Sequence, residues 1–199
     1  GKVKMTLATP EFAGFKKFGI QYAELLWIPA RDGFKLPASI TKPRDFDPTK
    51  KYPVIVEVYG GPSAPTVSNA FQSGAVWDNV LGNNGYICAK IDNRAATAIS
   101  KKLENLLLYR SPGEIELNDL VDGVRWLKQL PYVDPDRIGV TGWSGGGTNT
   151  VLGMTRSAEF RAGIAGGTMM DYRLYDSKWG EASMKTEKEN LKGYEENSL

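Results

Sequence analysis

A glycine-rich turn between a strand pattern and a helix pattern constrains the fold of this chain more than any other feature. The apolar run at residues 138–141 leads directly into Gly142-Trp143-Ser144-Gly145-Gly146, and residues 148–156 are predicted to form a helix. In the pattern G-x-S-x-G, the glycines remove side chains that would collide at a tight turn, and the turn lifts the serine hydroxyl clear of the sheet. A strand is therefore expected to end, and a helix to follow, around Ser144.

The rest of the chain alternates strand patterns with helix patterns. Residues 21–28 and 34–42 are predicted as two strands joined by the turn Arg31-Asp32-Gly33, which indicates an N-terminal hairpin. Further buried strands are predicted at residues 53–59, 86–91, 138–141 and 160–165, and helices at residues 69–81, 114–130 and 148–156. This alternation predicts an α/β fold with a mostly parallel sheet and helices on both faces. The charged residues 185–196 are predicted to form a solvated helix or tail.

Composition excludes several classes of protein. The 199 residues fit one domain, and 41% hydrophobic with 24% charged residues is ordinary for a globular protein. The formal charge of only +2 argues against a nucleic-acid partner. No apolar run approaches the ~18 residues of a membrane span. Cys88 is the single cysteine, so no internal disulfide can form, and nothing suggests a metal or organic cofactor.

Ser144 is the candidate nucleophile of this turn. In such a turn the backbone N–H of the next residue, Gly145, is expected to stabilise a developing oxyanion. A phosphate-binding loop is a rival explanation of the glycines. However, no lysine follows them as in G-x-x-x-x-G-K-[ST], and the chain contains no G-x-G-x-x-G. The nucleotide-binding interpretation is therefore set aside.

Four segments resemble the hydrolase domain of the prolyl oligopeptidase family, especially its dipeptidyl peptidase IV branch. They are, in chain order, Val58-Tyr59-Gly60-Gly61-Pro62, Asp92-Asn93-Arg94, residues 132–139, and Gly142-Trp143-Ser144 with Gly146-Gly147. The resemblance runs from about residue 27 to residue 190. It implies an α/β-hydrolase fold whose C-terminal part is missing from these 199 residues. It also implies an N-terminal β-propeller that this chain lacks.

The same resemblance implies roles for further residues. Tyr59 matches the tyrosine whose hydroxyl completes the oxyanion hole, and a purely packing role for this strand-end aromatic stays open. Tyr175 and Trp179 match aromatic positions that line the pocket for the proline side chain, although packing on the sheet is an equal alternative for Trp179. Two departures from the family are evident. Gly145 replaces a common tyrosine, and Ala95-Ala96-Thr97-Ala98-Ile99 replaces a glycine-rich stretch.

The chain contains no histidine, yet a serine hydroxyl is a weak nucleophile without a neighbouring base. A lysine or another chain would have to supply that base. In this fold the triad order is serine, acid, histidine, with the acid and the histidine after later strands. Asp171 and Asp176 follow the last predicted strand too soon, so neither is assigned to a triad.

These expectations combine into a serine peptidase domain that acts on peptides. The parent enzyme is expected to cleave Xaa-Pro or Xaa-Ala bonds through an acyl-enzyme on Ser144, whereas the isolated chain is expected to be inactive. An acyl esterase or carboxylesterase of the same fold, and a degenerate hydrolase fold that serves as an interaction module, stay open as alternatives. The resemblance suggests a homodimer and favours a periplasmic or secreted location, with a cytoplasmic one open.

Overall fold

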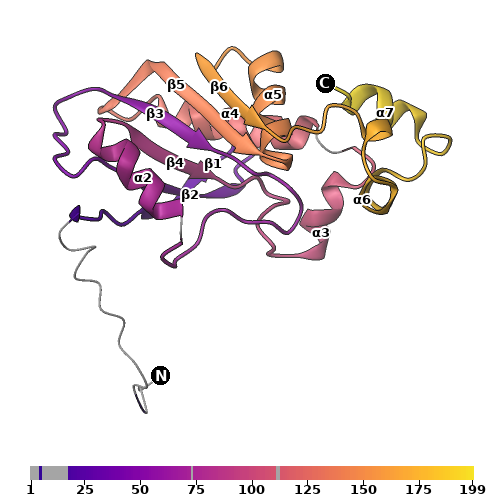
Figure 1. The fold of residues 1–199 in the computed structure, drawn as a ribbon, viewed down its shortest axis with the longest axis horizontal. Coiled ribbons are helices and arrows are strands. Elements are labelled where there is room, and N and C mark those ends of the chain that lie inside the picture. Colours follow the sequence, from indigo (N-terminus) through magenta and orange to yellow (C-terminus); the bar gives the residue numbers. More distant parts are fainter. Residues whose placement is uncertain (1–4, 6–17, 73, 111–112) are drawn as a thin grey trace.

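The computed structural model describes residues 5, 18–72, 74–110 and 113–199. One six-stranded sheet runs through these residues in the order β1-β2-β4-β3-β5-β6 (Figure 1). The strands are β1 (Glu24–Pro29), β2 (Lys35–Thr41), β3 (Tyr52–Glu57), β4 (Ile87–Ile91), β5 (Val133–Trp143) and β6 (Ala162–Gly166).

The pairing of the strands confirms both the N-terminal hairpin and the mostly parallel sheet. β1 and β2 are antiparallel, with Glu24 opposite Ile40, and β2 pairs with β4 in the same antiparallel sense. The remaining pairs, β3–β4, β3–β5 and β5–β6, are parallel. Because the carboxyl ends of parallel strands meet at one edge of the sheet, the loops after β3, β4 and β5 lie together there.

Helices cover the sheet from both faces, as predicted. The helices are α2 (Gly74–Asn83), α3 (Lys101–Glu104), α4 (Glu114–Leu127), α5 (Gly145–Arg156), α6 (Ser177–Met184) and α7 (Leu191–Asn197). Successive side chains of a strand point to opposite faces. In β4, Cys88 and Lys90 contact Asp78 of α2, whereas Ala89 and Ile91 belong to the core that includes α4.

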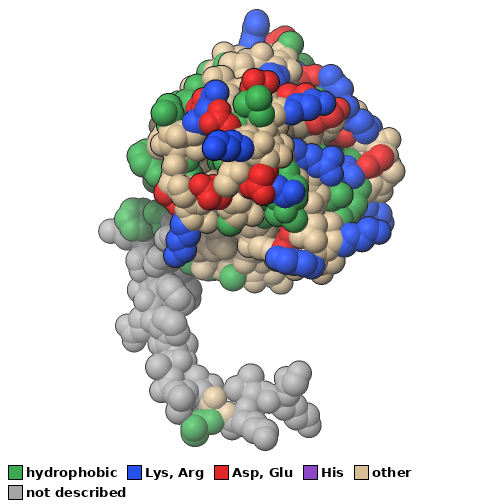
Figure 2. All heavy atoms as spheres, turned by 90° about the vertical axis from the view of Figure 1, so that its right-hand side faces the viewer, with side chains coloured by type: hydrophobic (Ala, Val, Ile, Leu, Met, Phe, Trp, Pro, Cys, Tyr) green, Lys and Arg blue, Asp and Glu red, His purple; other side chains and the backbone are tan. Residues whose placement is uncertain are grey.

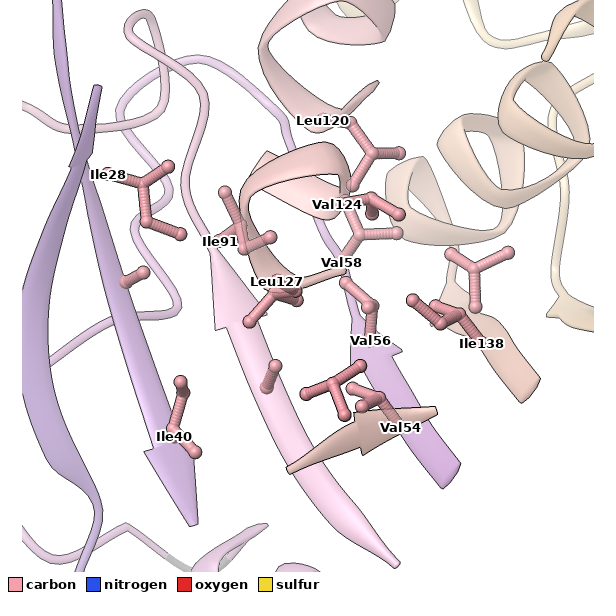
Figure 3. Close-up of a cluster of buried hydrophobic side chains, with 14 of the residues drawn as sticks. Ile28, Ile40, Val54, Val56, Val58, Ile91, Leu120, Val124, Leu127 and Ile138 are labelled. Carbon is pink, nitrogen blue, oxygen red and sulfur yellow. The ribbon is translucent and has the colours of Figure 1, made fainter. Parts of the chain in front are cut away.

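The main core lies between the sheet and helix α4 (Figure 3). On β3, Val54 and Val56 are almost fully buried, and they face the same cluster as Leu120, Val124 and Leu127 of α4. The three- and four-residue spacing of those α4 positions puts them on one stripe of the helix. Burial of such side chains contributes roughly 1.5–3 kcal/mol each, so this stripe holds α4 on the sheet.

Several predicted boundaries were wrong. Residues 69–72 are not helical, and α2 begins at Gly74. β5 begins at Val133, five residues before the predicted strand, because Tyr52 pairs with Val133, and the register shifts between that pair and the Val54–Ile138 pair. α5 begins directly after Ser144, and β6 ends at Gly166, one residue beyond the predicted strand.

Most of residues 185–196 are exposed, as predicted for a solvated helix or tail, but the helix in this segment also contributes a buried aromatic residue. Residues 191–197 form α7, and its Tyr194 is only 4% exposed. Tyr194 packs with Tyr172 and Met184 in a second small core, and Met184 ends the unpredicted helix α6. Met184 and Tyr194 lie in a sequence window rich in lysine and glutamate, and no periodic pattern of apolar residues marks the two helices there.

The surface of the α6–α7 end carries both signs of charge. Figure 2 views the molecule from this side, and lysine, arginine, aspartate and glutamate side chains are interspersed over it. Within the described part of the chain, none of the helices has the length and apolar character that crossing a bilayer requires.

Candidate active site

Ser144 occupies a sharp turn between β5 and α5. Its backbone has φ 56° and ψ −121°, so a non-glycine residue lies outside the ordinary right-handed regions. Such conformations cost on the order of 1–3 kcal/mol and persist where surrounding contacts hold them. Here the Ser144 N–H donates to the Gly166 carbonyl at 2.8 Å, and the Ser144 carbonyl accepts from the Thr148 N–H at 3.0 Å. The predicted strand-to-helix turn is present, and Ser144 lies outside the helix.

Glycine is required on both sides of this turn by close backbone contacts. A methyl group on Gly146 would collide with the carbonyl oxygen of Val58, and one on Gly142 would collide with the backbone of Gly146. β3 and β5 are adjacent parallel strands, and the Val58 N–H donates to the Thr141 carbonyl at 2.9 Å. The glycines therefore allow the end of β3 to lie directly against the turn.

This close approach brings Tyr59 beside Ser144. A methyl group placed on Gly145 would lie 3.6 Å from Cζ of Tyr59, which is an ordinary van der Waals separation. Tyr59 remains 38% exposed, so its ring is not a packed core residue. Gly145 is the first residue of α5, and the first N–H groups of a helix have no carbonyl partner within that helix. Tyr59 and the first residue of α5 thus lie side by side at the turn.

A pocket of about 80 Å³ brings the predicted site residues together. Ser144, Tyr59, Gly145, Tyr175 and Trp179 all line it. The rings of Tyr175 and Trp179 meet edge to face with centroids 6.1 Å apart. The assigned roles of these five residues stay predictions, although the fold has gathered them from three separate segments.

Sequence reasoning assigned no role to several other residues that line the same pocket, among them Asn149, Met169 and Tyr172. Tyr172 stacks on Trp179 with ring centroids 6.0 Å apart, and Met169 lines the wall beside it. Tyr172 lies in the same aromatic segment as Tyr175 and Trp179, so that segment could have been read as a whole. Met169 follows β6 without any pattern that marks it.

A larger open hollow of about 430 Å³ lies elsewhere, over the middle of β3, β5 and β6. Ile55, Gly139 and Ile164 are among its lining residues, and Ser144 is not. Chemistry therefore favours the smaller pocket as the candidate active site, because the half-buried candidate nucleophile Ser144 and the candidate donor residues Tyr59 and Gly145 line it.

The two aspartates after β6 are engaged in local structure. Asp171 pairs with Arg173 at 2.5 Å, and this hydrogen bond to the guanidinium lowers the pKa of the Asp171 carboxyl. Asp176 caps α6 by accepting the Trp179 N–H at 2.9 Å. Both carboxylates are therefore occupied by neighbouring residues, and the cap places Trp179 in the first turn of α6.

The segment Asp92-Asn93-Arg94 supports the loops around the site. The Asp92 carboxylate accepts the N–H groups of Thr66 and Val67 at 2.8 and 2.9 Å. Asn93 donates to the Gly60 carbonyl at 2.9 Å. Its side-chain oxygen accepts the N–H groups of Ala95 and Ala96, which are fully buried. The alanine-rich segment therefore folds underneath the loop that carries Tyr59.

Comparisons with known proteins identify the family of this chain. A model of the prolyl oligopeptidase family matches residues 76–199. Dipeptidyl peptidase 8 of Mus musculus is 36% identical over 174 residues, and the human protein of that name is 35% identical over the same length. These alignments cover 86% of this chain and 19% of each relative. The chain therefore spans about a fifth of the length of these relatives.

Two crystal structures also superimpose closely. A candidate dipeptidyl aminopeptidase IV from Bacteroides ovatus has a TM-score of 0.85 and 43% identity, over 91% of this chain and 26% of that one. Dipeptidyl peptidase 4 of Porphyromonas gingivalis has a TM-score of 0.86 and 34% identity, over 94% of this chain and 27% of that one. The fold is thus an α/β-hydrolase fold, and the chain belongs to the prolyl oligopeptidase family with dipeptidyl peptidase IV-like relatives.

Proposed function

We propose that this chain is a partial catalytic domain of a serine peptidase of the dipeptidyl peptidase IV type. Its substrates are peptides, cleaved after proline or alanine near the N-terminus. One observation carries the proposal: Ser144 lies on a strained turn in a pocket that Tyr59, Gly145 and the aromatic pair Tyr175–Trp179 also line. The dipeptidyl peptidase relatives support the reaction class.

In the proposed reaction Ser144 is the nucleophile, and Gly145 and Tyr59 are the oxyanion donors. The Ser144 hydroxyl oxygen attacks the peptide carbonyl carbon while a base takes its proton, and the carbonyl oxygen becomes an oxyanion. The Gly145 N–H and the Tyr59 hydroxyl donate hydrogen bonds to that oxyanion. The C–N bond then breaks and the leaving amine receives the proton. Water hydrolyses the resulting acyl-enzyme in a second step of the same kind.

Tyr172, Tyr175 and Trp179 form an aromatic wall that suits an apolar, ring-shaped side chain. Ligand pockets are typically apolar with a few placed polar groups, and this pocket follows that description. Gly145 contributes no side chain to the wall, so the space next to the Tyr59 ring stays open. We therefore assign proline or alanine recognition to this wall.

The base for this reaction comes from outside these 199 residues. The chain has no histidine, and no lysine, aspartate or glutamate is among the described residues that line the pocket. In the parent protein we assign the triad acid and histidine to a continuation of the domain. We assign the residues that bind the free amino end of the substrate to a β-propeller of the parent protein. We also propose that the parent protein forms a homodimer.

A chromogenic Gly-Pro anilide tests the proposal. The complete gene product should hydrolyse it, and Ser144→Ala should abolish turnover. Tyr59→Phe should lower kcat by about 10²–10³-fold, the loss measured for one oxyanion donor elsewhere. The isolated 199-residue chain should show no turnover. Full turnover by the isolated chain would overturn the assignment of the base.

An ester substrate separates the peptidase from an esterase of the same fold. An amine is a poorer leaving group than an alcohol, and a peptidase promotes its departure by protonating it. The complete gene product should therefore cleave both the anilide and a matched ester. Cleavage of the ester alone would favour the esterase alternative. Failure of a fluorophosphonate to label Ser144 in the complete gene product would favour a non-catalytic interaction module.

A further inference from the structure

We infer that Asn149 is a positioning residue that sets the separation of the two oxyanion donors. The inference rests on the proposed function, because it concerns the same pocket. Asn149 lies on α5, one helical turn after Gly145, and is 5% exposed. It belongs to none of the segments that carry the family resemblance.

One side-chain amide joins the two segments that carry the donors. The Asn149 Nδ2 atom donates to the Tyr59 carbonyl at 3.0 Å and to the Gly145 carbonyl at 3.1 Å. Both partners are carbonyl oxygens, so the amide nitrogen must face them. Its two hydrogens are thus divided between the loop after β3 and the first turn of α5.

The backbone of the Tyr59 loop is shaped to admit this amide. Gly60 has φ +81°, and a methyl group there would lie 2.6 Å from Asn149 Nδ2. On the other side, Asn93 donates to the Gly60 carbonyl at 2.9 Å. The loop is therefore held between two buried asparagines, Asn93 and Asn149. Asn149 belongs to α5 and so links the loop to that helix.

The position of the Tyr59 hydroxyl depends on this anchor. The ring is partly exposed and lies next to Gly145, which has no side chain to restrain it. Oxyanion donors act at about 2.7–3.1 Å from the developing charge, and misplacement by about 1 Å can cost on the order of 10²-fold in rate. Release of the Tyr59 carbonyl would let the hydroxyl drift relative to the Gly145 N–H.

The first test replaces the amide by an apolar side chain of similar size. In the complete gene product, Asn149→Leu should lower kcat for a Gly-Pro anilide by about tenfold to a hundredfold, with KM changed less than threefold. Asn79→Leu is the matched control. Asn79 is equally buried, and its Nδ2 atom donates to the carbonyl four residues earlier, Ala75, and to the remote carbonyl of Gln21.

A boronic acid that forms a tetrahedral adduct with serine separates positioning from loss of structure. Asn149→Leu should weaken its inhibition by the same factor as kcat, while inhibition by a non-covalent dipeptide product stays unchanged. Asn79→Leu should change neither. Equal losses in the two leucine variants, or an unchanged kcat in Asn149→Leu, would overturn the inference.

A second variant keeps the inference testable if Asn149→Leu does not fold. In Asn149→Ser the short hydroxyl can still bond the carbonyl four residues earlier, but it does not reach Tyr59. Asn149→Ser should therefore lower both kcat and the affinity for the boronic acid. If the unsubstituted protein neither cleaves peptides nor reacts with a fluorophosphonate, the proposed function itself fails. If it does both and the Asn149 variants match it, only the positioning role fails.

Discussion

Single residues at the end of β5 decide whether a reactive turn can form. Ser144 is held at φ 56° by backbone hydrogen bonds to Gly166 and Thr148, not by its own preference. The neighbouring positions 145 and 146 are both glycine, yet their surroundings differ. Gly146 meets the Val58 carbonyl, whereas a methyl group on Gly145 would only touch the Tyr59 ring.

This difference predicts opposite responses to the same substitution. Gly146→Ala should destabilise the fold by about 1–3 kcal/mol or more, because an added methyl group forces the β3 backbone away from α5. Gly145→Ala should leave stability unchanged or slightly higher, since alanine is the better helix former. The midpoints of urea denaturation would measure both, and equal midpoints for the two variants would contradict the prediction.

Helix α5 also contains a buried hydroxyl without a hydrogen-bond partner. Among the described residues, Thr150 Oγ1 is the one buried side-chain oxygen or nitrogen for which no partner is found. Thr150→Val removes that hydroxyl and should stabilise the fold by about 1 kcal/mol, since an unsatisfied polar group is costly to bury.

Thr148→Val is the matched control for this substitution. The Thr148 hydroxyl accepts the Met169 N–H at 3.1 Å and donates to the Met169 carbonyl at 3.0 Å. Its loss should destabilise the fold by about 1–3 kcal/mol. Thermal unfolding should therefore shift in opposite directions for the two valines, and a shift in the same direction would show that the hydroxyl of Thr150 is satisfied.

At the scale of elements, α6 and α7 form one unit that supports the aromatic wall. Tyr194 of α7 packs edge to face on Tyr172, which in turn stacks on Trp179 of α6. The Tyr194 hydroxyl donates to the Lys185 carbonyl at 2.7 Å and so ties the two helices together. The wall of the pocket therefore depends on a residue that does not line it.

Tyr194→Ala should loosen this unit without unfolding the sheet. Truncating a buried aromatic side chain typically costs 3–5 kcal/mol, and here the loss falls on a small core of three buried residues. Hydrogen exchange should accelerate in α6 and α7 and stay slow in α4. Tyr194→Phe keeps the ring and should show a smaller effect. Uniform acceleration across the sheet would contradict this local unit.

At the scale of the whole molecule, a charge network joins the N-terminal hairpin to the loop after β4 and to α4. The Arg94 guanidinium bonds Asp32 at 2.6 Å and Asp119 at 2.7 Å, and it lies over the Phe34 ring. Asp119 is 1% exposed and Asp32 is 51% exposed at their side chains. Arg94 thus connects a buried carboxylate with one at the surface.

This network predicts an acid-dependent contribution from Asp32. Hydrogen bonds from the Arg94 guanidinium and, to a smaller extent, from the Phe34 N–H lower the pKa of the Asp32 carboxyl from 3.8 to about 2. The folded state therefore holds this proton more weakly than the unfolded state, and the stabilisation is complete above the unfolded pKa and lost as pH falls toward 2. The effect should be small because Asp32 is half exposed.

Asp32→Asn measures the contribution directly. The difference in stability between the parent and the variant should shrink as pH is lowered from about 5 to about 2. Urea denaturation at several pH values would follow it. In an Arg94→Met background the pH dependence of the same substitution should be weaker, because only the Phe34 N–H then still donates to Asp32, and an undiminished dependence there would assign it to another group.

The sequence by itself determined the parts of this protein that local patterns specify. Alternating strand and helix patterns predicted the sheet and the helices that cover it, and G-x-S-x-G predicted the turn at Ser144. The order of four motifs predicted the family. These signals are local in the chain, because backbone conformation at a turn and one-sided burial along α4 depend on neighbouring residues.

Only the tertiary structure decided which distant residues meet. Asn149 lies 90 positions from Tyr59 and carries no motif, yet it bonds the Tyr59 carbonyl. Tyr194 lies in a charged stretch, yet it is buried beneath the aromatic wall. Such contacts follow from the order and register of the strands and from the packing of helices on the sheet, and no short window of sequence contains both partners.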